Sequence, residues 1–205
     1  MRRRAFLAGG VAGALAFTLG LGWWQVDGPG VEAGAARASD DPLLPLPLGQ
    51  HGWTLTAHTG AAVRPKDWVG RPTLAFLGFT HCPDVCPLTL SDISLWLEEL
   101  GEDAERLNVA LISVDPERDT PEVLADYLSY FDPRIVGLTG SPAEVARALS
   151  DFRAEAERIE DGEGDYTMNH TAGVFLFRAD GRFGGIIDFH EDRAFALPKI
   201  RRVLR

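Results

Sequence analysis

Two strand-length apolar runs, each followed by a segment with helix signals, constrain the fold of this chain most strongly. The runs are TLAFLGF at residues 73–79 and NVALISV at residues 108–114, and neither contains a charged side chain. Continuous runs of roughly four to eight such residues are typical of strands that are buried on both faces. Together they predict an α/β domain in which the first run is a central strand.

Helix and strand signals alternate along the rest of the chain. Residues 53–58 alternate in polarity before a glycine turn, which predicts a short strand or hairpin, and residues 88–100 carry apolar side chains at helical spacing. Thr120 and Ser141 each occupy an N-cap position before a further helix. Near the C-terminus, two strands joined by a turn at Gly181 predict a hairpin, followed by a last helix. A mixed sheet flanked by helices in this order is what a thioredoxin-like domain shows.

The N-terminal part has a different composition from the rest. Arginines at positions 2–4 precede a charge-free apolar run at residues 6–24, which is close to the length that spans a bilayer. A basic start before an apolar run directs a chain to a membrane. We therefore expect residues 1–26 to be an export signal or membrane anchor, residues 27–50 to be a linker rich in Gly, Ala and Pro, and residues 51–205 to be the folded domain. The domain is then expected outside the cytoplasm, on the periplasmic side of the inner membrane.

The charge of the chain excludes one class of partner. The formal net charge is −10, and the acidic excess lies in the predicted domain, since four of the basic residues are in the N-terminal part. An acidic body repels phosphate backbones, so we expect no nucleic acid partner. The predicted domain is also long enough to bury a core without a covalent staple.

Both cysteines of the chain, Cys82 and Cys86, stand between the first apolar run and the first helix. Residues four apart share a helical face, so the two sulfurs can meet one ion or each other. We also expect the helix start to favour a negative sulfur and to lower the thiol pKa. Two thiolates suit Cu(I), whereas a tetrahedral zinc site usually needs four protein ligands and an iron–sulfur cluster needs four cysteines, which this chain lacks. The same spacing allows a reversible, redox-active disulfide.

A third metal ligand remains open among five histidines. We expect the two before the first apolar run to be ordinary surface residues, and His190 lies among charged residues. His81 is adjacent to Cys82 and would point the other way in an extended segment. His170 follows a polar, glycine-rich loop and precedes a buried strand, while Met168 is a soft ligand that more often serves packing. The five histidines are His51, His58, His81, His170 and His190.

Three segments resemble motifs of the SCO/SenC family: FLGFTHCPDVCP, SVDPERDTPEVLADYL and YTMNHTAGVFLF. Members of this family are membrane-tethered copper chaperones of thioredoxin fold that serve cytochrome c oxidase assembly, and the resemblance covers most of residues 45–204. It implies that Cys82, Cys86 and His170 bind copper. It also matches Asp115 to an acidic position of the family, where we expect the carboxylate to order the loop after the strand and not to bind the metal.

One departure from the family pattern lies beside the histidine. Asn169 and Thr171 stand where the family usually has Asp and Ser. Both residues keep the ability to form hydrogen bonds, but the replacement of Asp removes a charge. We therefore expect the surroundings of the histidine to tune metal affinity differently in this chain.

The resemblance implies a metallochaperone, not an enzyme, that delivers copper to the binuclear copper site of cytochrome c oxidase. Its implied partners are the copper-accepting oxidase subunit, other copper carriers or thiol reductants, and the membrane. The alternative is a thiol–disulfide oxidoreductase that keeps the oxidase cysteines reduced through Cys82 and Cys86. His170 separates the two, because dithiol exchange needs no distant imidazole. A purely structural disulfide would close a short loop that stabilises the fold by only about 2 kcal/mol.

Overall fold

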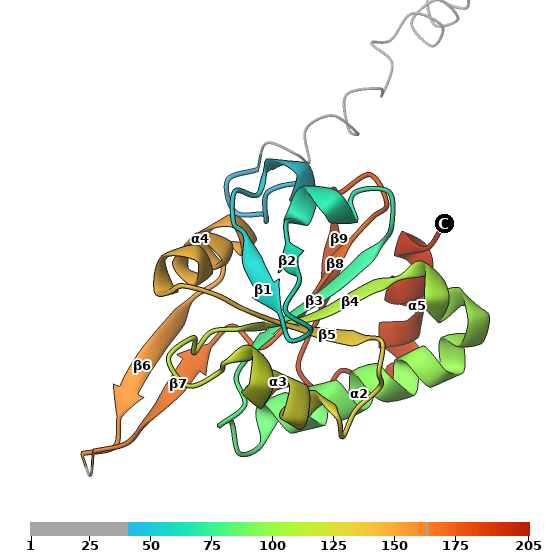
Figure 1. The fold of residues 1–205 in the computed structure, drawn as a ribbon. Coiled ribbons are helices and arrows are strands. Elements are labelled where there is room, and N and C mark those ends of the chain that lie inside the picture. Colours follow the sequence, from blue (N-terminus) through green and yellow to red (C-terminus); the bar gives the residue numbers. More distant parts are fainter. Residues whose placement is uncertain (1–40, 163) are drawn as a thin grey trace, which may run out of the picture. The chain divides into compact units, whose positions relative to one another are not determined.

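Strand β3 (Thr73–Gly78) lies inside a seven-stranded sheet, and all of its residues are buried. The computed structural model describes residues 41–162 and 164–205 (Figure 1). β3 pairs in parallel with β4 (Asn108–Ser113) and antiparallel with β8 (Val174–Phe177). The prediction of a central strand is confirmed, and its uninterrupted apolar sequence reflects burial on both faces.

The remaining strands extend this sheet on both sides of β3 and β4. β5 (Ile135–Thr139) continues the parallel part, and the antiparallel pair β1 (Leu55–Ala57) and β2 (Ala62–Val63) follows it. On the other side, β9 (Phe183–Ile187) pairs with β8 through the turn at Gly181. The strand order is β2-β1-β5-β4-β3-β8-β9, so the predicted mixed sheet and both predicted hairpins are confirmed.

Helices cover both faces of the sheet (Figure 1). Phe152 of α4 contacts the rings of Phe175 and Phe177 on one face, and α3 packs over Gly137 on the other. The α-helices are α2 (Val85–Leu100), α3 (Pro121–Leu128), α4 (Pro142–Phe152) and α5 (Arg193–Val203). Short 3-10 helices are η1 (Leu48–Gln50), η2 (Pro65–Trp68) and η3 (Gly101–Arg106).

The two predicted N-caps are present. Thr120 Oγ1 accepts a hydrogen bond from the Val123 N–H at 3.3 Å, and Ser141 Oγ accepts one from the Glu144 N–H at 3.3 Å. The Glu144 carboxylate, however, accepts the Thr54 N–H at 2.6 Å and so joins α4 to the start of β1. The cap itself is a local interaction, whereas the partner of this carboxylate is set by tertiary packing.

The predicted linker is wrong in its last part. Leu48 has no exposed surface, and its N–H donates to the Gly181 carbonyl oxygen at 2.8 Å. The folded domain therefore begins before residue 51. Residues 1–26 and the rest of the predicted linker up to residue 40 lie outside the described residues. Within the part that is described, no helix combines the length and the apolar character needed to cross a bilayer.

His51, predicted at the surface, is a core residue with only 7% of its surface exposed. Its ring lies 5.1 Å from that of Phe152 and 5.9 Å from that of Phe177. Trp53 Nε1 donates to His51 Nδ1 at 3.2 Å, and Nε2 donates to the Leu46 carbonyl oxygen at 2.8 Å. An indole N–H only donates and a carbonyl only accepts, so the proton is on Nε2. Burial lowers the pKa of His51, and the folded protein holds this ring neutral.

The stability of the fold should therefore decrease in mild acid. A histidine in the unfolded chain titrates at about pH 6.5. Below that pH the unfolded chain binds a proton at position 51, whereas burial keeps His51 of the folded chain unprotonated to lower pH. The contribution is fully present above this pH and is lost as the pH falls toward the folded pKa. Urea unfolding near pH 7.5 and near pH 5.5 measures the change in the free energy of unfolding. This free energy should decrease less in His51→Gln than in the wild type. An equal loss in both proteins would contradict this origin.

Candidate metal centre

The two cysteines lie on either side of the boundary between a loop and a helix. We call residues 79–84, which join β3 to α2, the cysteine loop. Cys86 is the second residue of α2 and is fully buried, whereas Cys82 lies in the loop and is partly exposed; both are free thiols. The predicted shared helical face is therefore wrong, because the helix begins at Val85. Instead, Cys82 Sγ accepts a hydrogen bond from the Cys86 N–H at 3.4 Å, while Asp84 at the N-cap makes no side-chain capping bond.

Cys86 packs directly on the last residue of β3. A Cβ atom at Gly78 would lie 3.1 Å from Cys86 Sγ and 2.8 Å from the Phe76 ring, so only glycine allows this close approach. Burial raises the pKa of the Cys86 thiol, and a backbone hydrogen bond at Phe79 opposes it only in part. The predicted lowering of the thiol pKa by the helix start is wrong for Cys86, because desolvation exceeds that effect.

His170 lies on a hairpin that the sequence pattern did not reveal. β6 (Ala156–Glu160) and β7 (Tyr166–His170) form a separate antiparallel pair where a polar loop was predicted. The hairpin brings His170 Nε2 to 3.6 Å from Cys86 Sγ. A signal was available, since an Asp-Gly pair at residues 161–162 is typical of hairpin turns, and Gly162 has a φ of +80°.

The hydrogen bonding of His170 sets its tautomer. Its Nδ1 donates to the Thr171 carbonyl oxygen at 3.0 Å, so Nε2 directs a lone pair at the Cys86 thiol. The rings of Phe76 and Phe79 lie 6.3 and 5.7 Å from the imidazole and pack edge-on around it. Burial lowers the pKa of His170, so the ring is neutral, as a metal ligand must be.

Two of the three predicted ligands, Cys86 and His170, are thus close to each other, and the third, Cys82, lies next to Cys86. Metal–sulfur and metal–nitrogen bonds of about 2.3 and 2.0 Å that meet at roughly 110° span the 3.6 Å between Cys86 Sγ and His170 Nε2. Across residues 41–162 and 164–205, no three His, Cys, Asp or Glu side chains already converge as a metal site. Cys82 would need to turn its side chain toward the other two, and its position in a partly exposed loop allows this.

The other candidate ligands have different partners. Met168 packs against the core and, two residues before His170 on β7, lies on the same face of the strand. The remaining histidines form hydrogen bonds elsewhere: His51 with Leu46, His58 with Gly137, His81 with Thr80, and His190 with Asp92.

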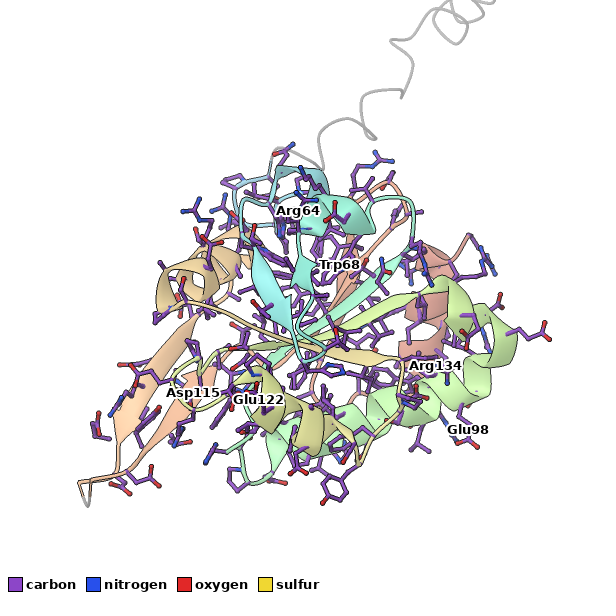
Figure 2. All side chains as sticks on the ribbon, in the orientation of Figure 1. Arg64, Trp68, Glu98, Asp115, Glu122 and Arg134 are labelled. Carbon is purple, nitrogen blue, oxygen red and sulfur yellow. The ribbon has the colours of Figure 1, made fainter. Side chains whose placement is uncertain are left out.

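Asp115 orders the loop after β4, as expected, and also holds the hairpin. Its side chain is only 3% exposed, and its main-chain carbonyl accepts the N–H groups of Arg118 and Asp119. Its carboxylate pairs with Arg118 at 2.5 Å and accepts the Tyr166 hydroxyl at 2.8 Å. Figure 2 shows Asp115 at the end of the domain that carries β6 and β7. The carboxylate thereby fixes the strand that carries His170.

Asp119 is a second buried carboxylate at the site, and no sequence motif pointed to it. It has no exposed surface. Its oxygens accept the Thr80 N–H at 3.2 Å, the Thr80 hydroxyl at 2.6 Å and the Ser113 hydroxyl at 2.6 Å. These bonds join the cysteine loop to the end of β4. Asp119 therefore positions the loop that carries Cys82.

A mixed sheet that places a buried cysteine of a C-x-x-x-C pair against a histidine defines a thioredoxin-like protein with a candidate soft-metal centre. The family model described as SCO1/SenC matches residues 46–205. The chain therefore belongs to the SCO1/SenC family. The resemblance of its three motifs to this family is thus confirmed over nearly the whole described part.

Curated relatives agree with this membership. The chain is 39% identical over 153 residues to the protein SCO2 homolog, mitochondrial, of Danio rerio, covering 73% of this chain and 54% of that protein. It is 40% identical over 147 residues to the human SCO1 homolog, mitochondrial, covering 69% of this chain and 46% of that protein. The matched part thus spans about half the length of these relatives.

Solved structures confirm the fold. Bradyrhizobium japonicum ScoI with copper bound superposes with a TM-score of 0.69 at 45% identity, covering 74% of this chain and 96% of that one. Yeast Sco1 with copper bound gives a TM-score of 0.67 at 31% identity, covering 78% and 87%. The thioredoxin-like architecture predicted from the order of strands and helices is therefore confirmed.

Removing the Asp119 carboxylate should destabilise the fold and loosen the cysteine loop. Asp119→Ala leaves the buried Thr80 and Ser113 donors without a charged acceptor, and we expect a loss of about 3 kcal/mol in the free energy of unfolding. Urea unfolding measures this loss. Asp103→Ala is the matched control, because Asp103 forms an exposed pair with Arg106 and should cost less than about 0.5 kcal/mol. Hydrogen exchange at the Thr80 amide should accelerate in the first variant, and unchanged protection there would contradict the positioning role.

Proposed function

We propose that this protein binds a copper ion through Cys82, Cys86 and His170 and delivers it to the copper-accepting subunit of cytochrome c oxidase during assembly. One observation carries the proposal: the lone pair of a neutral His170 Nε2 faces Cys86 Sγ at 3.6 Å, and the second cysteine is one hydrogen bond away. The copper-bound structures of family members at 31–45% identity support it. The protein acts as a carrier and not as an enzyme.

The surroundings of the site favour Cu(I). Two thiolates and an imidazole are soft or intermediate ligands, and the apolar rings of Phe76 and Phe79 limit access of water. Because burial raises the pKa of Cys86, its thiol must release a proton as the ion binds. The ion takes the position of that proton between sulfur and Nε2. Copper affinity should therefore rise with pH while the site remains reduced.

The two cysteines have different roles in transfer. Cys82 is partly exposed in the cysteine loop, whereas Cys86 is buried beneath it. An ion that enters from a donor or leaves for an acceptor contacts Cys82 first, and Cys86 and His170 then retain it. A loop ligand in front of two ligands on regular strands and helices suits a carrier, which must release its metal again.

The residues beside the histidine fit this role despite the departure from the family pattern. Thr171 holds His170 through its carbonyl oxygen, and its hydroxyl accepts the Glu155 N–H at 3.1 Å. Asn169 is exposed and pairs across the hairpin with Glu157. The charge that an Asp would carry at this position would therefore lie at the surface of the hairpin, where solvent would screen it.

We also infer that residues 1–26 export the domain or anchor it, so that it works on the outer side of the membrane. The basic start and the apolar run at residues 6–24 support this inference. An alternative function, thiol–disulfide exchange, is supported by the adjacency of Cys82 and Cys86. It would use the same pair as a redox-active disulfide, with Cys82 as the exposed thiol.

Replacing His170 separates the two functions. His170→Ala removes the nitrogen ligand, and we expect the affinity for Cu(I) to fall by more than about tenfold, while Cys82 and Cys86 still form a disulfide on oxidation. Competition with a Cu(I) chelator under reducing conditions measures the affinity. His81→Ala is the matched control, since His81 is exposed beside the cysteine pair and should not change the affinity.

The same variants should differ in cells. A strain that produces His170→Ala at normal levels should assemble less active oxidase when copper is scarce, and a strain with His81→Ala should not. Equal copper affinity in wild type and His170→Ala would remove His170 from the site. Full oxidase activity of the His170→Ala strain under copper limitation would instead favour thiol–disulfide exchange.

A further inference from the structure

Arginines line a pocket of about 670 Å³ at the end of the sheet where β3 begins. Its walls come from residues 70–72, residues 178–180 and residues 202–205, with Glu105 and Arg106 from η3. We call it the arginine pocket. The arginines that line it are Arg71, Arg106, Arg178, Arg202 and Arg205.

The carboxylates at this pocket do not neutralise its arginines. Glu105 pairs with Arg134 at 3.3 Å, and Asp180 pairs with Arg182 at 2.7 Å, and both of these arginines lie outside the pocket lining. Among the lining arginines, Arg106 has a carboxylate partner at 3.1 Å, but that partner is outside the pocket. Glu105 and Asp180 therefore form their ion pairs with arginines outside the pocket, and Arg178 adds a Coulombic attraction to Asp180.

The other four arginines are exposed residues of the pocket wall. Arg71 donates to main-chain carbonyl oxygens, including that of Leu107 at 3.1 Å, and these hold its guanidinium without cancelling its charge. In the described ranges, Arg71, Arg178, Arg202 and Arg205 form no ion pair with a carboxylate side chain. Like charges around a concave surface repel one another, and an anion bound among them would be attracted to each of them.

The chemistry of the lining points to a phosphate group. Guanidinium groups bind phosphate oxygens through two parallel hydrogen bonds, and several around one pocket can share a single phosphate. The volume exceeds that of a phosphate alone and accommodates a group attached to it. The pocket is also a local exception on a chain of net charge −10, which otherwise repels anions.

The position of the pocket indicates where such a phosphate comes from. Gly70 N–H donates to the Ala179 carbonyl oxygen at 2.7 Å, and Leu48 N–H donates to that of Gly181 at 2.8 Å, so η1 lies beside the pocket wall. Leu46, just before η1, donates its N–H to the Asp151 carbonyl oxygen of α4 at 2.9 Å. The segment predicted to enter a membrane precedes these residues in the chain. The cysteine centre lies at the other end of β3, where Cys86 packs on Gly78.

We propose that the arginine pocket binds the phosphate of an anionic membrane lipid. The tethered domain then rests on the membrane at this end and presents Cys82, Cys86 and His170 away from it. Attraction between arginines and anionic lipids acts within about one Debye length, roughly 8–10 Å, so arginines that reach the lipid surface are attracted while acidic groups on other faces are screened. This contact does not depend on copper, and it persists if the copper assignment fails.

Photo-crosslinking of the full chain in vesicles tests the contact. The vesicles carry a phospholipid with a photoreactive headgroup, either as the phosphatidylglycerol or as the phosphatidylcholine analogue. We expect crosslinks in peptides containing residues 70–72, 178–182 and 202–205, with the anionic analogue preferred. Arg178→Gln/Arg202→Gln should lower their yield by roughly tenfold, since each arginine near an anionic surface contributes strongly. Arg147→Gln/Arg193→Gln removes the same charge from other surfaces and is the matched control.

Several outcomes would overturn the proposal. The first is an equal crosslink yield in the two double variants, and the second is an equal yield with the two lipid analogues. The third is a spread of crosslinks over all faces of the domain. Inorganic phosphate in the millimolar range provides a further arm. If it abolishes the crosslinks at these peptides, the pocket takes a free anion and not a lipid headgroup. Circular dichroism of both double variants establishes that neither has lost its fold.

Discussion

The close packing of the Cys86 thiol on Gly78 is the contact on which the centre depends. It fixes where α2 begins against β3 and leaves an apolar recess that the His170 ring enters from a different part of the chain. Burial there acts on both groups, because it raises the pKa of the thiol and lowers that of the imidazole. The free site is thus a neutral pair that shares one proton, and a metal ion can replace that proton without leaving an unpaired buried charge.

Two buried carboxylates hold the segments that carry this pair. Asp119 joins the cysteine loop to β4 through the Thr80 and Ser113 hydroxyls, and Asp115 joins the loop after β4 to β7 through Tyr166. Such networks are stable only when every polar group has a partner, and they then restrict the backbone strongly. Cys86 and His170 are therefore held close together without a metal, while Cys82 lies in the partly exposed cysteine loop.

The two ends of the sheet differ in chemical character. Sulfur, imidazole and buried carboxylates lie near the carboxyl ends of β3 and β4, and the arginine pocket lies at the start of β3. A rigid sheet between them keeps the two surfaces apart, at the rise of roughly 3.3 Å per residue of β3. The proposed carrier, held at the membrane by one end, would keep its metal site free for partners at the other.

Local signals in the sequence determined the strands β3, β4 and β8, the N-caps at Thr120 and Ser141, the C-terminal hairpin and the position of the cysteine pair. These features depend on neighbouring residues, so propensity and periodicity reveal them. The burial of His51 and Leu48, the hairpin β6–β7 and the role of Asp119 were decided only by tertiary structure. The hairpin is largely exposed and so lacks an apolar pattern, and the meeting of Cys86 with His170 joins residues 84 positions apart. The geometry of this contact depends on how the hairpin packs against the sheet, and no local sequence pattern encodes that packing.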